Sequence, residues 1–209
     1  MNKKLRLLVT ATCHNRFPLC CNKQFKFDEI PVVDRFDYEE IMITGGEPLL
    51  YPERVEKLCK SIRDVTEQMG ITPKIYIYTA KPIWHHIERA IKYYADGIVV
   101  APHSKDDIAF FRETNNCLLK HSRYGNTFDC SLRLKVFPEV KDALPENLKC
   151  WKVTESEWIE NCPLPEGEDS VVFQNSGLKT NGRLWQRRFI FHFQYRIMTW
   201  KSAESMRRE

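Results

Sequence analysis

The sequence predicts an α/β fold, built of parallel strands with helices on their outer side, from two kinds of segment that alternate along the chain. Short runs rich in β-branched and aromatic residues are bounded by Gly, Pro and polar residues, which is typical of strands. The segments between them carry apolar residues three and four positions apart, which is typical of helices that cover a sheet. Because right-handed crossovers join the strands of such repeats, we expect successive strands to be parallel neighbours.

Six strands and three helices are expected in the first part of the chain. The strands are residues 5–12, 40–44, 74–79, 97–101, 130–137 and 170–174, and the helices are residues 52–68, 82–94 and 104–111. The first helix has Pro52 in its first turn and Gly70 just after its end, which are favoured places for these residues. Ser104 is a suitable N-cap for the third helix, with Asp107 three residues on.

The chain is expected to form a single domain over residues 1–209, with residues 138–209 as a less regular C-terminal extension. Residues 138–167 contain four prolines among acidic and aromatic residues, which favours an irregular crossover. The aromatic and basic stretch 183–200 fits the spacing of a strand and of a helix. Its length favours the helix.

The composition is that of an ordinary globular protein, with 43% hydrophobic and 29% charged residues and a net charge of +4. No apolar run approaches the roughly 18 residues that span a bilayer, so we expect a cytoplasmic protein without a membrane partner. In such a protein, clustered cysteines indicate metal or redox chemistry more often than disulfides. Five of the eight cysteines are scattered, and we expect them to be structural or free thiols.

The clustered cysteines are Cys13, Cys20 and Cys21, and they follow the first predicted strand directly. Thiolates close together in one loop suit iron or zinc. Zinc sites typically use Cys-x-x-Cys pairs, and the sequence has none. Taken alone, this loop fits a metal site and a loop with buried thiols about equally well.

A second motif ends the second predicted strand, with the sequence Gly45-Gly46-Glu47-Pro48. Two glycines let backbone amides approach a ligand without obstruction by side chains. The carboxylate that follows can accept hydrogen bonds from an ammonium group, and the proline stiffens the exit. A plain strand-to-helix turn would explain the two glycines, but not the whole motif at this position.

Together the two motifs resemble the radical SAM superfamily, in which a Cys-x3-Cys-x2-Cys loop follows strand one and Gly-Gly-Glu-Pro ends strand two. The resemblance spans residues 5–137 and implies a partial (β/α)6 barrel with outer helices. It also implies a [4Fe–4S] cluster held by three thiolates, with the fourth iron open to S-adenosylmethionine (SAM). An electron, supplied by a flavodoxin or ferredoxin, would split the sulfonium of SAM and yield a 5′-deoxyadenosyl radical.

The resemblance makes Cys13 the first cluster ligand and Cys20 the third, with Cys21 a spare thiol beside it. The second ligand position is occupied by Phe17, which cannot bind iron. Two functions are therefore open. The chain is a radical SAM enzyme that recruits Cys21 or His14 as a replacement ligand, or it is a catalytically impaired form that keeps the fold.

The remaining predicted contacts lie where ligands bind in parallel α/β proteins, at the carboxyl ends of the strands. The resemblance makes the Gly-Gly-Glu-Pro segment the receiver of the SAM ammonium group. On strand five, Arg133 or Lys135 is placed to meet a carboxylate. The full set of predicted SAM contacts is Gly45, Gly46, Glu47, Pro48, Thr79, His103, Ser104 and Arg133.

The basic C-terminal stretch leaves a third function open. Arg187, Arg188 and Arg196 alternate with aromatic residues, a pattern that can stack on and neutralise nucleic acid. The same pattern fits an amphipathic helix whose rings pack on the sheet while its cations reach solvent. Packing is the preferred interpretation, so nucleic acid is a possible but not favoured partner.

Overall fold

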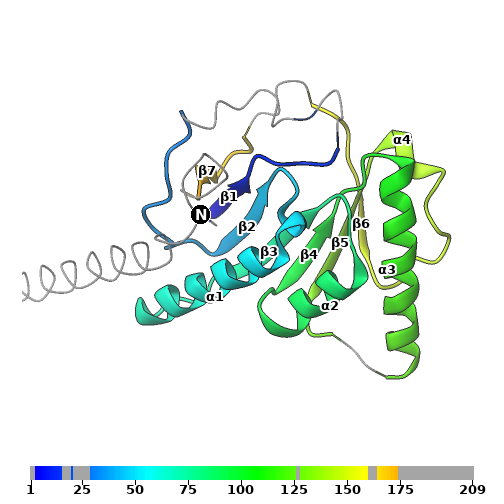
Figure 1. The fold of residues 1–209 in the computed structure, drawn as a ribbon, viewed down its shortest axis with the longest axis horizontal. Coiled ribbons are helices and arrows are strands. Elements are labelled where there is room, and N and C mark those ends of the chain that lie inside the picture. Colours follow the sequence, from blue (N-terminus) through cyan, green and yellow to red (C-terminus); the bar gives the residue numbers. More distant parts are fainter. Residues whose placement is uncertain (1–2, 16–19, 21–28, 126–127, 160–163, 174–209) are drawn as a thin grey trace, which may run out of the picture.

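The structure, a computed structural model, describes residues 3–15, 20, 29–125, 128–159 and 164–173. It is an α/β fold with one parallel sheet of seven strands (Figure 1). Phe17, Cys21 and the predicted helix at 183–200 lie outside the described residues.

The observed elements follow the predicted alternation closely through the first 137 residues. The strands are β1 (Lys4–Thr10), β2 (Glu40–Gly45), β3 (Lys74–Thr79), β4 (Gly97–Val100), β5 (Ser131–Val136), β6 (Lys152–Glu155) and β7 (Glu168–Val172). The helices are the 3-10 turn η2 (Pro48–Leu50), then α1 (Pro52–Gln68), α2 (Trp84–Tyr93), α3 (Lys105–Arg123) and α4 (Pro138–Lys141).

The strands run β6-β5-β4-β3-β2-β1-β7 across the sheet, and every neighbouring pair is parallel. The predicted order of the first four strands is therefore confirmed. The sheet is open, with β6 and β7 as its edges. The predicted crossover at 138–167 was wrong over residues 152–155, which form β6 beside β5. The predicted sixth strand is β7, and it lies at the other edge, beside β1.

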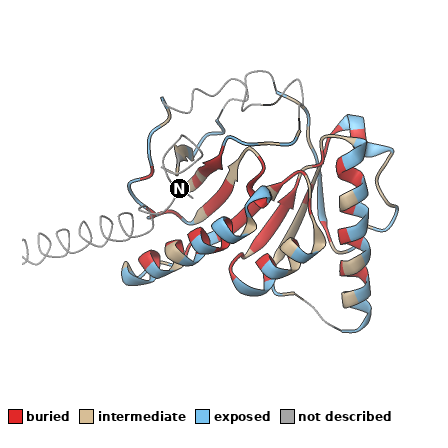
Figure 2. Ribbon diagram, viewed as in Figure 1, coloured by how far each residue is buried: buried red, intermediate tan, exposed pale blue. Residues whose placement is uncertain are grey.

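The core lies between the sheet and the helices, which lie along one face of the sheet (Figure 1). Alternate strand residues such as Leu5, Leu7, Ile41 and Ile43 point to this face and are fully buried. Figure 2 shows buried residues along the central strands and on the sides of the helices that meet them. Within the described residues, no helix is long and apolar enough to cross a membrane.

Helix α3 extends to Arg123, twelve residues beyond the predicted end at Phe111. The polar residues Thr114 and Asn115 interrupt the apolar pattern, yet both are buried. The Thr114 hydroxyl donates to the Pro82 carbonyl at 2.7 Å, so this polar group is satisfied inside the core. Because the hydroxyl finds a partner in the loop between β3 and α2, burial of a polar residue here does not end the helix.

Candidate functional site

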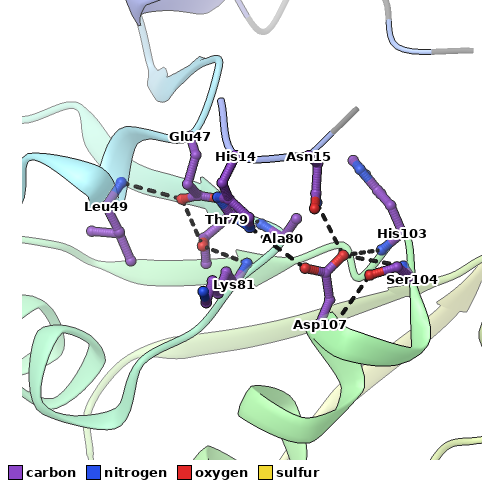
Figure 3. Close-up of polar contacts among 10 residues, drawn as sticks. All are labelled: His14, Asn15, Glu47, Leu49, Thr79, Ala80, Lys81, His103, Ser104 and Asp107. Atoms are coloured by element: carbon purple, nitrogen blue, oxygen red, sulfur yellow. Dashed lines mark hydrogen bonds and ion pairs between the residues drawn. The ribbon is translucent and has the colours of Figure 1, made fainter. Parts of the chain in front are cut away.

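The carboxyl ends of β1 to β4 bring most of the predicted site residues to one edge of the sheet. The cysteine loop follows β1, the Gly-Gly-Glu segment ends β2, Thr79 ends β3, and His103 and Ser104 follow β4. Figure 3 shows two hydrogen-bond networks there, one centred on Glu47 and one on Asp107. We call this edge the rim, defined as residues 10–15, 44–48, 79–81 and 101–107.

Glu47 is buried at the rim, with 2% of its surface exposed. Its carboxylate accepts hydrogen bonds from the Leu49 amide at 3.2 Å, the Thr79 hydroxyl at 2.8 Å and the Ala80 amide at 2.9 Å (Figure 3). Burial raises the pKa of Glu47 to about 7, although these donors oppose the rise. A carboxylate offers about four lone-pair positions, and these are largely used by donors within the protein. In this structure, the Glu47 carboxylate links the end of β2 to the end of β3 through these hydrogen bonds.

Thr79, predicted as a ligand contact, belongs to the same network. It is 3% exposed, and besides donating to Glu47 its hydroxyl accepts from the Lys81 amide at 3.1 Å. The hydroxyl is therefore used within the protein, and it orients the Glu47 carboxylate.

Gly45 and Gly46 allow two segments of backbone to approach each other closely. A Cβ on Gly45 would lie 2.4 Å from the Thr10 carbonyl oxygen, and one on Gly46 would lie 2.0 Å from that of Thr12. The close approach permits backbone hydrogen bonds from Gly46 to Thr10 at 2.6 Å and from Glu47 to Thr12 at 2.8 Å. The sequence predicted approach to a ligand at this point. The structure shows approach to the end of β1, where the cysteine loop begins.

Pro48 completes the motif by starting the short turn η2, and it is buried. Its fixed backbone angle suits the first position of a helical turn. The motif therefore leads the chain from the rim back toward α1.

The described part of the cysteine loop contains Cys13 and Cys20, both half-buried free thiols. Burial raises the pKa of Cys13, and the negative groups of Glu47, Cys20 and Asp107 act in the same direction. A bound cation would reverse this electrostatic cost. Over the described ranges, no three His, Cys, Asp or Glu side chains are arranged to hold a metal ion.

Asp107 connects the cysteine loop to the start of α3, a contact that the sequence did not reveal. Its carboxylate accepts from the Asn15 side chain at 3.0 Å and from the His103 and Ser104 amides at 2.9 and 3.1 Å (Figure 3). The His14 imidazole lies 3.6 Å away. The predicted N-cap Ser104 is confirmed, as its hydroxyl accepts from the Asp107 amide. The spacing of the cap in the sequence therefore identified Ser104 and Asp107 as a pair, but it did not identify the contact of Asp107 with the cysteine loop.

His103 forms part of an aromatic wall at the rim. Its ring centroid lies 5.7 Å from that of Phe137 and 5.1 Å from that of Trp158, and these two rings stack on each other at 3.9 Å. Burial lowers the pKa of His103, which favours the neutral imidazole. Trp158 comes from the irregular segment after β6, and no pattern in the sequence placed it here.

Among the described residues that were predicted to contact SAM, Arg133 lies away from the rim. Its guanidinium is 4.1 Å from the centre of the Tyr76 ring and 3.8 Å from the carboxylate of Glu40, the first residue of β2. Arg133 therefore points toward the amino ends of the strands, on the sheet face opposite the helices.

No protein-family model and no curated protein matches this chain. The class of protein is therefore defined by the fold and the rim. It is an α/β protein with a parallel sheet, in which strands β1 to β6 follow one another across the sheet in the order of the sequence. The start of its cysteine loop is hydrogen-bonded to the Gly-Gly-Glu segment at the carboxyl ends of the strands.

Proposed function

We propose that the chain is a radical SAM protein, whose rim is built to hold an iron–sulfur cluster and SAM for radical chemistry on a substrate. The observation that carries the proposal is the pair of backbone hydrogen bonds from Gly46 and Glu47 to Thr10 and Thr12. These bonds join the two motifs of the resemblance directly before Cys13. The proposed redox partner is a flavodoxin or ferredoxin.

The strand order supports a partial barrel for this protein. The five steps from β1 to β6 all run in the same direction across the sheet. Right-handed crossovers in one direction place their helices on the same face, and a twisted sheet covered in this way can curve around its other face. The proposed partial (β/α)6 barrel therefore consists of β1 to β6, with β7 added beside β1.

The described residues fit the cluster only in part. Cys13 and Cys20 are near enough to interact electrostatically, and they would supply two of the three thiolates. SAM would meet the Gly45–Glu47 segment at the carboxyl end of β2. A complete cluster supplies the electron that splits SAM. With two described thiols the donor set is incomplete, so Phe17 decides whether the chain is an enzyme or an impaired form.

Substituting Phe17 tests this point, because a cubane iron without a protein ligand is readily lost. We expect the unmodified protein, reconstituted without oxygen, to hold substoichiometric iron and to produce no 5′-deoxyadenosine from SAM with a strong reductant. Phe17→Cys should raise the iron and sulfide content toward about four each per chain, and 5′-deoxyadenosine should appear. Cys117→Ser, which removes a thiol on α3, is the matched control and should change nothing.

A full cluster and SAM cleavage in the unmodified protein would contradict the impaired form. Cys21→Ser and His14→Ala would then identify the replacement ligand, because loss of that ligand would remove iron. If Phe17→Cys also fails to bind iron and SAM, the radical SAM proposal itself is wrong.

A further inference from the structure

A second polar cluster lies on the sheet face opposite the helices. It is built from strand residues that alternate with the buried apolar ones of β1, β2 and β5. We call it the inner-face cluster, and its charged members are Lys4, Arg6, Glu40, Arg133, Lys135 and Glu168. Two tyrosines of β3 lie among them, with Arg133 4.1 Å from the Tyr76 ring centre and Lys135 5.6 Å from that of Tyr78.

The inner-face cluster carries an excess of positive charge. Four cations stand against two carboxylates, a formal net charge of +2. Both carboxylates are already paired: Glu168 with Arg6 at 2.6 Å, and Glu40 with Lys4 at 4.0 Å and Arg133 at 3.8 Å. In the described part of the chain, no carboxylate lies within 4.0 Å of the Lys135 ammonium.

Lys135 is half-buried among like charges. Burial lowers its pKa, and Arg6, Arg133 and Lys4 lower it further, with Glu168 opposing. Burial likewise raises the pKa of the Tyr78 hydroxyl. Cations gathered in a partly desolvated place are costly unless an anion joins them. The geometry therefore favours an anionic ligand.

The C-terminal stretch of the sequence is itself basic. Residues 179–209 contain eight Lys or Arg and two Glu, so their charge has the same sign as that of the cluster. The cluster also lies below the rim: Arg6 is four residues before the end of β1, which corresponds to about 13 Å of strand. Lys135, one residue before the end of β5, is the member nearest the rim.

We propose that the inner-face cluster binds the carboxylate or phosphate group of a small-molecule substrate, with Lys135 and Arg133 as the binding cations. The proposal rests on the proposed function in one respect, namely that the bound molecule is the substrate of the rim. Its anionic group then lies below the rim, and its opposite end faces the cysteine loop. Arg133, predicted from sequence as a SAM contact, is reassigned to this anion.

The test uses the full chain without iron or SAM, so that it does not depend on cluster chemistry. Isothermal titration calorimetry at low salt measures binding of inorganic phosphate, of succinate and of neutral succinamide. We expect one or both anions to bind and succinamide not to bind. Which anion binds more tightly distinguishes a phosphate from a carboxylate substrate. Higher salt should weaken the binding.

Lys135→Met and Arg133→Met should each weaken anion binding by about tenfold or more, because a charged hydrogen bond is lost. Lys135→Arg, which keeps the charge, should restore most of the affinity even if Lys135→Met folds poorly. Lys57→Met, which removes an exposed cation on the outer face of α1, is the matched control and should bind as the unmodified protein does.

The proposal is overturned if neither anion binds at about 10 mM, or if Lys57→Met weakens binding as much as Lys135→Met. It is also overturned if both methionine variants at 133 and 135 bind as tightly as the unmodified protein. If the anions bind as expected while Phe17→Cys neither holds iron nor cleaves SAM, the anion site stands and the radical SAM function fails.

Discussion

At the scale of single residues, Glu47 is the most consequential side chain of the rim. Sequence motif and structure agree on its position but differ on its surroundings, since the carboxylate faces three donors inside the protein. The motif identified which residue lies there. It could not identify the burial, because burial depends on how the ends of β2 and β3 pack together.

The raised pKa of Glu47 predicts a pH-dependent stability. The pKa is about 7 in the folded protein and 4.5 in the reference state, a difference equivalent to about 3 kcal/mol. Because the folded value is the higher one, the folded state binds the proton more tightly. The stabilisation of the folded state by this bound proton is complete below pH 4.5 and is lost as the pH rises through 7. Urea unfolding of the unmodified protein and of Glu47→Gln, measured across this range, checks the prediction.

The free energy of unfolding of the unmodified protein, minus that of Glu47→Gln, should fall by about 3 kcal/mol from pH 4 to pH 8. Glu53→Gln is the control, because Glu53 is exposed in the first turn of α1 and its substitution should produce no such dependence. Parallel pH profiles for Glu47→Gln and the unmodified protein would show that the carboxylate is not desolvated.

At the scale of elements, α3 organises both the core and the rim. Its buried Asn115 accepts from the Trp151 indole at 3.0 Å and donates to the Asn147 carbonyl at 3.0 Å. The helix therefore fixes the segment between β5 and β6, which the sequence predicted only as irregular. A polar residue in the middle of a helix gives no sign in the sequence of a partner more than thirty residues away.

Asn115→Leu tests this attachment. The substitution leaves a buried indole N–H and a carbonyl without partners, and it should lower the free energy of unfolding by about 3 kcal/mol. Asn116→Leu, at the exposed neighbouring position, should change it by no more than about 0.5 kcal/mol. Equal effects of the two substitutions in denaturant unfolding would contradict the buried network.

The start of α3 should control the reactivity of the cysteine loop. Ser104→Ala removes the N-cap and should cost about 1 kcal/mol of stability, without releasing the loop. Asp107→Ala also removes the acceptor of the Asn15 side chain, so Cys13 should become more exposed and its pKa should fall toward the ordinary value. Alkylation by iodoacetamide, followed by peptide mass spectrometry, should be faster at Cys13 in Asp107→Ala only. Equal rates in the two variants would disprove the attachment.

At the scale of the whole molecule, the sequence predicted the parallel sheet and the order of its first four strands because each βα unit is local and strongly patterned. It did not predict β6, whose four residues are all exposed and show no alternation. It predicted a strand near residue 170 but not its partner, because pairing with β1 depends on the whole fold. The rim was predictable for the same reason as the sheet, since strand ends meet at one edge. The inner-face cluster was not predictable from the sequence. It depends on which side chains of β1, β2 and β5 share one face of the sheet, and on the pairing of β7 with β1.

The return of β7 to β1 also determines the order in which the protein can assemble as it is made. Arg6 and Glu168 are paired although 162 residues separate them. At about 5–20 residues per second, the ribosome needs about 10 to 30 s to deliver the partner of the first strand. During that interval the outer edge of β1 presents unpaired backbone groups, which other chains can bind. Among the described strands, β1 is thus made well before its outer edge can be covered by β7, and that edge is where a chaperone would protect the nascent chain.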